Sequence, residues 1–234
     1  MIPDWCEANY AWSPYIAEWW NTWSSVLYIL LGLRGLHAAV NAVPHQYSIQ
    51  RVRLCFYCLM LVGVGSSIFH ATLTAVGQAA DELAMIACIH SGLSMTTEKL
   101  SEMVLVLLSF VACVFTYCIS SFYVFTLIIS LTISYLVFRS YRLVRNGSNR
   151  TAKSLYLLGV MSTASGFFLF WLPEHALCVI YPVRERGSLQ KVPLHAMWHV
   201  LTAFGAYAWI LAGTINHLEA QYKRERSNKV QPTV

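Results

Sequence analysis

The feature that most constrains this chain is the recurrence of long apolar runs along its whole length. Each run approaches the roughly 20 residues that a helix needs to cross about 30 Å of hydrocarbon, although several lie at the short end of that range. Charged residues make up only 12% of the chain, against roughly 25% in soluble domains. We count seven runs, at 19–36, 54–69, 79–97, 103–119, 122–138, 155–171 and 194–215.

The length of these runs predicts an all-α integral membrane protein, a bundle of seven transmembrane helices. A membrane barrel would alternate in polarity over segments of about ten residues, and these runs do not. We divide the chain into a lumenal N-terminal segment at 1–18, the helical domain at 19–217 and a basic cytosolic tail at 218–234. No repeat or low-complexity tract indicates a further domain.

Lysine and arginine predict the orientation, because cytosolic loops carry an excess of both. One side of the predicted bundle holds only Arg184, Arg186 and Lys191, and the other side holds most of the basic residues. The N-terminus is therefore expected to be lumenal and the C-terminus cytosolic, in the endoplasmic reticulum or Golgi. Basic loops of this kind are ordinary beside membrane spans, so we expect no nucleic-acid partner. No obligate protein partner is inferred either.

Among the ionisable residues on the predicted lumenal side, four stand at the ends of predicted helices and share one depth: His70, Asp81, His195 and His199. His195 and His199 are four residues apart, so both project from one face of a helix. Such a pair alone is more often a packing feature than a metal site. Ionisable residues within spans are costly and usually functional, however, and His70 reaches the same depth from a distant helix. The three histidines therefore predict a zinc site with an open fourth position.

Other histidines serve as comparisons for this assignment. His90 points to another part of its helix, nearer the middle of the membrane, and is expected to be a satisfied bundle residue. His175 lies on the lumenal side in a predicted loop and remains a minor rival ligand. The CxxC sequence of Cys55 and Cys58 is interpreted as bundle packing.

The acidic segment before the first helix offers oxygen ligands at short spacing. Ca²⁺ takes six to eight oxygens, so the segment suits calcium better than zinc. A solvated acidic terminus explains the same residues slightly better, and both interpretations stay open. The candidate calcium ligands are Asp4, the carbonyl of Trp5, Glu7, Asn9 and Glu18.

Several motifs together resemble the alkaline ceramidases in order and spacing. These are DWCEANY, IAEWWNTWS, GSSIFHATL, GQAADELAMI, FLFWLPEHALC and HAMWHVL. The wider superfamily, which includes the progestin and adipoQ receptors, shares the three-histidine plan but not DWCE. The family usually carries Asp shortly after the sixth-helix Trp, where this chain has Glu174, whose role the sequence does not assign.

The resemblance implies zinc on the three histidines, with Ser66 and Asp81 beside it in the active site. It implies calcium on the N-terminal segment and a disulfide between Cys6 and Cys178. It also implies the reaction, which is hydrolysis of the ceramide amide to sphingosine and a fatty acid. Asp81 would be the general base, and Ser66 would donate a hydrogen bond to the tetrahedral oxyanion.

Three other functions remain open at this point. An adipoQ-type receptor could keep the histidines, and a lipid-remodelling ester hydrolase would use the same zinc chemistry. A structural zinc protein would need a fourth ligand, for which His175 or Glu174 is the candidate. One further expectation concerns the sequons at Asn146 and Asn149, which the basic loop around them places in the cytosol, unglycosylated.

Overall fold

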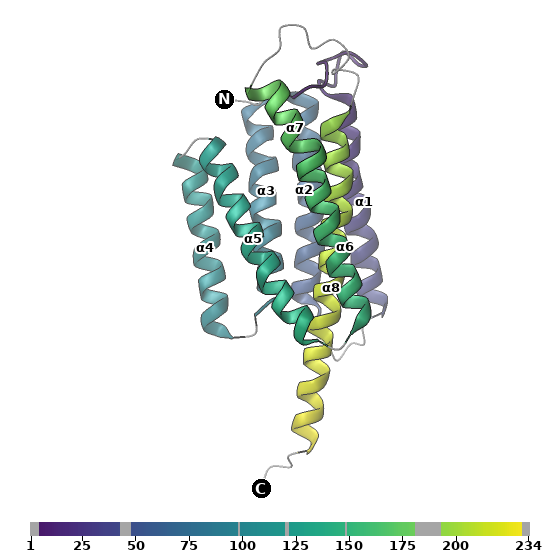
Figure 1. The fold of residues 1–234 in the computed structure, drawn as a ribbon, viewed down its shortest axis with the longest axis vertical. Helices are drawn as coiled ribbons and strands as arrows, with labels where there is room; N and C mark the ends of the chain where they lie inside the picture. Colours follow the sequence, from purple (N-terminus) through teal and green to yellow (C-terminus); the bar gives the residue numbers. More distant parts are fainter. Residues whose placement is uncertain are drawn as a thin grey trace.

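A computed structural model describes residues 5–42, 48–97, 99–119, 122–147, 149–180 and 193–230. The described residues form helices and no strands, so the all-α prediction is confirmed. The long helices are α1 (Trp19–Ala42), α2 (Gln50–Thr72), α3 (Ala75–Ser94), α4 (Leu100–Ile119), α5 (Phe122–Asn146), α6 (Arg150–Gly166) and α8 (Leu194–Val230). They run side by side in a bundle (Figure 1).

Six helical segments in the described part of the chain are long and apolar enough to cross a membrane. The segment at Ala75–Ser94, α3, is not among them, so the count of seven spans is not confirmed. Gln78, Asp81, Glu82 and His90 lower the hydropathy of α3 relative to its neighbours. Helix α3 nevertheless lies within the bundle, packed against α2 (Figure 1).

The outer surface of the bundle is apolar, as expected for a multi-pass membrane protein. On α4, Leu105 and Phe115 are each 64% exposed, and Leu131 on α5 is 62% exposed. Apolar surface of this extent would be unstable in water but is solvated by lipid chains. Helix α4 buries none of its own residues, so nearly its whole circumference faces outward.

The core lies between α1, α2 and α8, where the apolar faces of the three helices meet. Phe56 and Leu59 of α2 are fully buried there, against Leu31 of α1 and Ile210 of α8. Gly35 makes the close approach possible, since a Cβ at this position would lie 2.1 Å from the Phe56 ring. This tight contact holds α1 and α2 together as an antiparallel pair, so that the start of α1 meets the end of α2.

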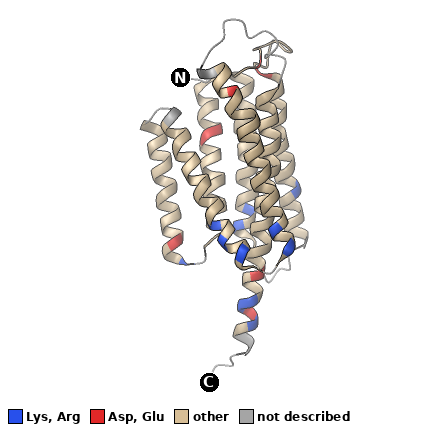
Figure 2. Ribbon diagram, in the orientation of Figure 1, with Lys and Arg blue, Asp and Glu red and all other residues tan. Residues whose placement is uncertain are grey.

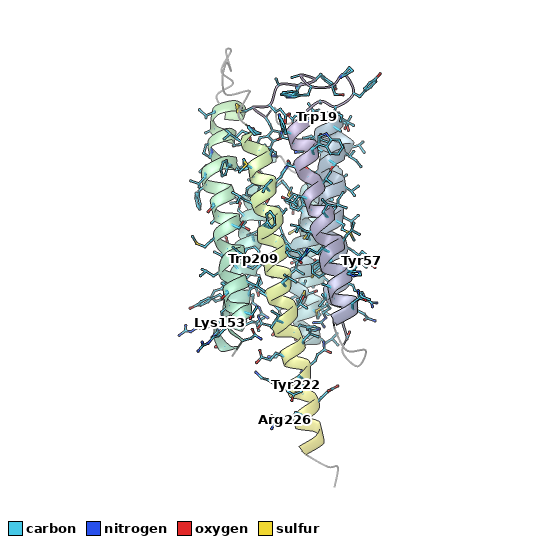
Figure 3. The ribbon with its side chains drawn as sticks, turned by 90° about the vertical axis from the view of Figure 1, so that its right-hand side faces the viewer. Trp19, Tyr57, Lys153, Trp209, Tyr222 and Arg226 are labelled. Carbon is cyan, nitrogen blue, oxygen red and sulfur yellow. A yellow bond between two sulfur atoms is a disulfide. The ribbon has the colours of Figure 1, made fainter. Side chains whose placement is uncertain are left out.

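The two ends of the bundle differ in charge. Lysine and arginine gather at the end where α8 leaves the bundle, together with acidic residues of α4 and α8, whereas the opposite end, near the N-terminus, shows acidic residues and no basic ones among those described (Figure 2). Trp19 lies at the N-terminal end of the bundle. Arg226 lies at the opposite end, on the part of α8 that extends beyond the other helices (Figure 3). The segment predicted as a basic tail, from residue 218, continues α8 as helix through Val230.

Candidate metal centre and active site

Three histidines from two helices meet at the N-terminal end of the bundle. His70 lies near the end of α2, and His195 and His199 lie in the first two turns of α8. The ring centroids of the three are between 4.6 and 5.0 Å apart, and each residue offers a ligand atom within 4.8 Å of the others. All three are buried, so the convergence predicted from the sequence is found in the structure.

His70 is held by a carboxylate on the segment that precedes α1. Glu18 Oε2 lies 2.5 Å from His70 Nδ1. Backbone bonds fix the two segments together, because Glu18 N donates to the His70 carbonyl at 2.9 Å and Ala17 N donates to the Ala71 carbonyl at 3.0 Å. His70 Nε2 is buried and has no hydrogen-bond partner in the described part of the chain.

His195 is held by a second carboxylate, that of Glu174 in α7 (Leu172–Glu174). Glu174 Oε2 lies 3.1 Å from His195 Nδ1, and Glu174 Oε1 accepts a hydrogen bond from the backbone N–H of Cys6 at 3.0 Å. The Trp5 ring packs on His195 with centroids 3.9 Å apart. Glu174 therefore has a definite place in the site, which the sequence did not assign.

His199 is held by hydroxyl and carbonyl oxygens of α1. Its Nδ1 lies 2.9 Å from Ser24 Oγ, 3.2 Å from Ser25 Oγ and 3.2 Å from the Asn21 carbonyl oxygen. All three histidines thus engage an oxygen through Nδ1. An imidazole that donates from Nδ1 presents an unprotonated Nε2, which is the form that binds a metal.

The donor set fits zinc. Zinc in hydrolytic sites takes three protein ligands and keeps one position for water, and second-shell carboxylates commonly orient the histidines. The unpartnered Nε2 of His70 is the atom that such an ion would satisfy. Within the described residues, these three histidines form the one cluster with this geometry.

Ser66 and Asp81 line the same cavity as the histidines. Both are buried, Ser66 on α2 one turn before His70 and Asp81 in the second turn of α3. Gly65 brings these two helices together, since a Cβ on Gly65 would lie 2.7 Å from the Ala80 carbonyl oxygen and 2.8 Å from Asp81 N. A residue with a side chain at this position would separate Ser66 from Asp81.

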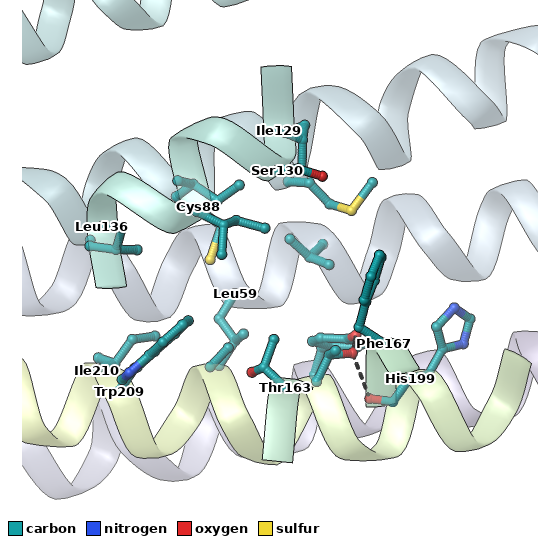
Figure 4. A pocket seen from close by; sticks show the side chains of 18 of the residues that line it. Leu59, Cys88, Ile129, Ser130, Leu136, Thr163, Phe167, His199, Trp209 and Ile210 are labelled. Carbon is teal, nitrogen blue, oxygen red and sulfur yellow. Dashed lines mark hydrogen bonds between the residues drawn. The ribbon is translucent and has the colours of Figure 1, made fainter. Parts of the chain in front are cut away.

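A mostly apolar cavity extends from this site into the bundle. His199 lies at one end, and Leu136, Trp209 and Ile210 lie toward the other (Figure 4). Its walls come from α2, α3, α5, α6 and α8. A polar site that opens into a long apolar cavity suits a substrate with a polar head and a hydrocarbon chain.

The N-terminal segment covers the site and carries most of the candidate calcium ligands. Glu7 accepts hydrogen bonds from Trp20 N at 2.7 Å and Asn21 N at 3.0 Å, and so caps α1. Burial raises the pKa of Glu7, and the nearby Glu18 carboxylate raises it further. Glu18 Oε1 and Asn21 Oδ1 are buried with no hydrogen-bond partner among the described residues. Asp4 lies outside the described residues.

These contacts fit a bound cation in part. A cation would neutralise two close carboxylates and satisfy the unpartnered Glu18 oxygen. The sequence assigned Glu18 to calcium only. In the structure its second oxygen, Oε2, contacts His70 and accepts a hydrogen bond from Asn21 Nδ2 at 3.0 Å. The solvated-terminus interpretation does not describe Glu7 and Glu18, which are both buried.

A disulfide joins Cys6 to Cys178, the pair that the sequence resemblance implied. It fastens the N-terminal segment to the π-helical segment η2 (His175–Ile180). Another π-helical segment, η1 (Phe167–Trp171), precedes α7, and π-helical turns are frequently found at functional sites. Cys55 and Cys58 are buried free thiols, and Cys55 donates to Met95 Sδ at 3.0 Å, which confirms a packing role.

The comparison histidines take other places. Both nitrogens of His90 are engaged, by the Ile86 carbonyl oxygen and Ser109 Oγ, each at 2.8 Å, as expected of a satisfied bundle histidine. The prediction of a loop at His175 is wrong, because the helix that begins at Arg150 continues through η1 and α7 into η2. His175 stacks on Trp171 with centroids 4.7 Å apart and is not part of the histidine cluster.

Sequence reasoning missed the groups that orient the histidines: Glu18 in this role, Glu174, Ser24 and Ser25. The burial of the two carboxylates and their contacts with the histidines are known only from the structure, so neither role could be predicted from the sequence. The serines carried no signal either, because serine is common near helix starts.

Comparisons with known proteins place the chain among related sequences. Residues 2–232 match the family model described as Ceramidase. The chain is 30% identical to alkaline ceramidase YPC1 of Saccharomyces cerevisiae, over 92% of this chain and 75% of the yeast protein. It is 29% identical to alkaline ceramidase 3 of Mus musculus, over 89% of this chain and 80% of the relative. It is also 29% identical to mouse alkaline ceramidase 1, over 85% and 73%.

Proposed function

This chain belongs to the ceramidase family, and from that premise we propose that it hydrolyses the amide bond of ceramide at a zinc ion held by His70, His195 and His199. The observation that carries the zinc assignment is the common orientation of the three rings. Each Nδ1 is engaged by an oxygen, and the Nε2 of His70 is buried without a hydrogen-bond partner among the described residues.

A zinc ion bound there would lower the pKa of water toward about 7 and polarise the amide carbonyl. The remaining chemistry falls to side chains of this protein. Asp81 accepts a proton from the attacking water as the oxygen bonds to the carbonyl carbon, and returns it to the amide nitrogen as the C–N bond breaks. The products are sphingosine and a free fatty acid.

Ser66 donates a hydrogen bond to the carbonyl oxygen as negative charge develops on it. Such a donor stabilises the transition state more than the substrate, and losing one costs about 10²–10³ in kcat in other hydrolases. The close contact of α2 and α3 at Gly65 keeps Ser66 and Asp81 on one side of the histidines, so that both reach the same amide.

The cavity supports a lipid substrate. Its polar end holds Ser66, Asp81 and the three histidines, and its inner part is lined by apolar side chains such as Leu136 and Ile210. Ceramide enters from the bilayer with its amide at the histidines and a hydrocarbon chain in the apolar part (Figure 4). Placing the amide there leaves the headgroup near the N-terminal end of the bundle.

Calcium binds the N-terminal segment in this proposal, through Asp4, the Trp5 carbonyl, Glu7, Asn9 and Glu18. The support is the pair of buried carboxylates and the unpartnered Glu18 Oε1. Because Glu18 also contacts His70, a cation here would stabilise one arrangement of a zinc ligand. The ion would therefore act on activity through the geometry of the zinc site.

The same proposal places the protein in the endoplasmic reticulum or Golgi, with the N-terminus lumenal and the C-terminus cytosolic. Basic residues at the end from which α8 extends support this orientation (Figure 2). An oxidising lumen is also the compartment in which the Cys6–Cys178 disulfide persists.

One experiment tests the function directly. Purified protein is assayed for release of fatty acid from N-acyl sphingosines, with an ester lipid of equal chain length as the alternative substrate, and its metal content is measured. The proposal expects amide hydrolysis and one zinc per chain. Zinc without any hydrolysis would favour a receptor or a structural site, and hydrolysis of the ester alone would favour a lipid-remodelling esterase.

A further inference from the structure

Ser25 stands where α1 meets α2 and α8, between two groups of the proposed active site. Its side chain is 0% exposed. Its Oγ lies 2.9 Å from Ser66 Oγ on α2 and 3.2 Å from His199 Nδ1 on α8. The hydroxyl also reaches the Asn21 carbonyl oxygen at 2.7 Å, one turn earlier in α1. One buried hydroxyl thus contacts both a proposed zinc ligand and the proposed oxyanion donor.

The protons of this cluster can be assigned from its chemistry. A histidine that binds metal through Nε2 carries its proton on Nδ1, so His199 donates toward the serine oxygens. The single Ser25 hydrogen has two acceptors within reach, the Asn21 carbonyl at 2.7 Å and Ser66 Oγ at 2.9 Å. The Ser24 hydroxyl also donates to the Asn21 carbonyl, at 3.0 Å, so this oxygen keeps a partner when Ser25 donates to Ser66. Between the two serine oxygens Ser25 is the donor and Ser66 the acceptor.

This arrangement has a consequence for Ser66. With its oxygen accepting from Ser25, the Ser66 hydroxyl hydrogen points away from Ser25, toward the cavity that Ser66 lines. That is the direction in which it must donate to the developing oxyanion. Without Ser25, the hydroxyl of Ser66 could rotate to other acceptors and would lose this preorganisation.

Ser24 provides a natural contrast on the next residue of the same helix. Its Oγ lies 2.9 Å from His199 Nδ1, closer than that of Ser25, and donates to the Asn21 carbonyl. No contact with Ser66 is found for Ser24 within the described residues. The two serines therefore share the contact with His199 and differ in the contact with Ser66.

We propose that Ser25 is a positioning residue of the hydrolase, which holds His199 for zinc and aims the hydroxyl of Ser66 at the substrate carbonyl. The inference rests on the proposed function for the roles of His199 and Ser66. It goes beyond that function because it assigns a task to a third side chain that touches neither substrate nor metal.

The test compares Ser25→Ala with the matched control Ser24→Ala in purified protein. Zinc affinity is measured by competition with a chromophoric chelator, which requires no turnover. Both variants are expected to bind zinc more weakly, within the 10–100-fold range typical of lost outer-shell contacts. Steady-state kinetics are then measured at saturating zinc, so that the difference in metal binding no longer affects the rate.

Both variants lose a contact with His199, so the comparison between them isolates the contact with Ser66. At saturating zinc, Ser25→Ala should be at least about tenfold slower in kcat than Ser24→Ala, with KM unchanged. The Ser66→Ala variant supplies the second arm of a double-mutant cycle. In that background, Ser25→Ala should lower kcat by less than about twofold, because the hydroxyl it orients is already gone.

Each result decides a stated part of the inference. Equal kcat values for the Ser24 and Ser25 variants, or fully additive Ser25 and Ser66 effects, would overturn the role toward Ser66. Unchanged zinc affinity in Ser25→Ala would overturn the role toward His199. A wild-type protein that binds zinc without hydrolysing ceramide would instead refute the proposed function, and the chelator measurement would still decide the contact with His199.

Folding of the variants is checked separately. Ser25→Thr keeps the hydroxyl and should restore most of the rate lost in Ser25→Ala, whereas Ser25→Cys keeps the size of the side chain and should not. Thermal unfolding midpoints within a few degrees of wild type for the cysteine variant would show that the loss is not one of fold. If the cysteine variant were as active as the threonine variant, the hydroxyl would have no special role and the inference would fail.

Discussion

Glu174 Oε2 lies 3.1 Å from His195 Nδ1, so a carboxylate of the α6–α7 segment orients a histidine of α8. The other oxygen of Glu174 accepts the Cys6 N–H. Glu174 therefore joins the histidine cluster to the disulfide-bonded N-terminal segment.

Replacing Glu174 should weaken zinc binding before it affects anything else. Glu174→Gln keeps an acceptor for Cys6 N–H but removes the charge beside His195, and zinc affinity should fall by about 10–100-fold. Chelator competition measures this. Glu225→Gln, on the part of α8 beyond the bundle, is the control for loss of one acidic charge and should bind zinc normally. Unchanged affinity in Glu174→Gln would show that the negative charge of Glu174 does not contribute to zinc binding.

The three histidines should behave alike and differ from His90. His70→Ala, His195→Ala and His199→Ala each remove a zinc ligand and should abolish both stoichiometric zinc and hydrolysis. His90→Ala should retain both, because the bonds of His90 are to Ile86 and Ser109 rather than to the site. Metal analysis and ceramide turnover check this, and full activity with two of the three ligands removed would refute the zinc assignment.

Asp81→Asn should separate metal binding from proton transfer. The amide cannot accept the proton of the attacking water, so turnover should fall to background while zinc stays bound at the wild-type level. Glu82→Gln is the neighbouring control, since Glu82 accepts from Gln78 Nε2 at 3.0 Å on the same helix. Near-normal rates in Asp81→Asn together with loss in Glu82→Gln would transfer the role of base to Glu82.

Calcium should matter through the N-terminal segment. Glu7→Ala and Glu18→Ala should each raise the calcium concentration needed for half-maximal activity, because each removes an oxygen ligand. Glu18→Ala should also weaken zinc binding, since Glu18 contacts His70. Titration of activity with calcium at fixed free zinc measures the first effect, and competition with a zinc chelator measures the second. Unchanged activity under strong calcium chelation would leave Glu18 with its contact to His70 only.

The sequons at Asn146 and Asn149 should remain unmodified in cells. Asn149 caps α6, its Oδ1 accepting from Ala152 N at 3.1 Å, and Asn146 is the last residue of α5. Both lie at the basic end of the bundle, which we place in the cytosol, away from the lumenal transferase (Figure 2). A glycosidase-sensitive mass shift that is absent in the Asn146→Gln, Asn149→Gln double variant would invert the proposed topology.

The convergence of His70, His195 and His199 could be predicted because helical spacing and membrane depth are both legible in sequence. The disulfide could be predicted only from the resemblance to a family. The supporting groups could not be predicted in either way. The contact of Glu18 with His70 depends on how closely the start of α1 approaches the end of α2. Glycines and backbone hydrogen bonds between the two helices set that distance.

Helix α3 shows the opposite limit. Its hydropathy is lowered by the polar residues that the site requires, Asp81 among them, so composition alone no longer identifies it as a span. The course of α6 was also beyond sequence reasoning, because Pro173 suggests a helix end and π-helical turns instead carry the helix onward past Glu174.

The disulfide has a consequence for how the protein is made. Cys6 and Cys178 are separated by 172 residues, and His199 follows them in the chain. A ribosome delivers the N-terminal segment first, so Cys6 waits as a free thiol until the segment after α6 has been synthesised and inserted. The histidine pair of α8 is added later still. The growing polypeptide thus cannot assemble the three-histidine cluster until nearly its whole length has been synthesised. A product truncated before α8 would carry His70 without the histidine pair that completes the cluster.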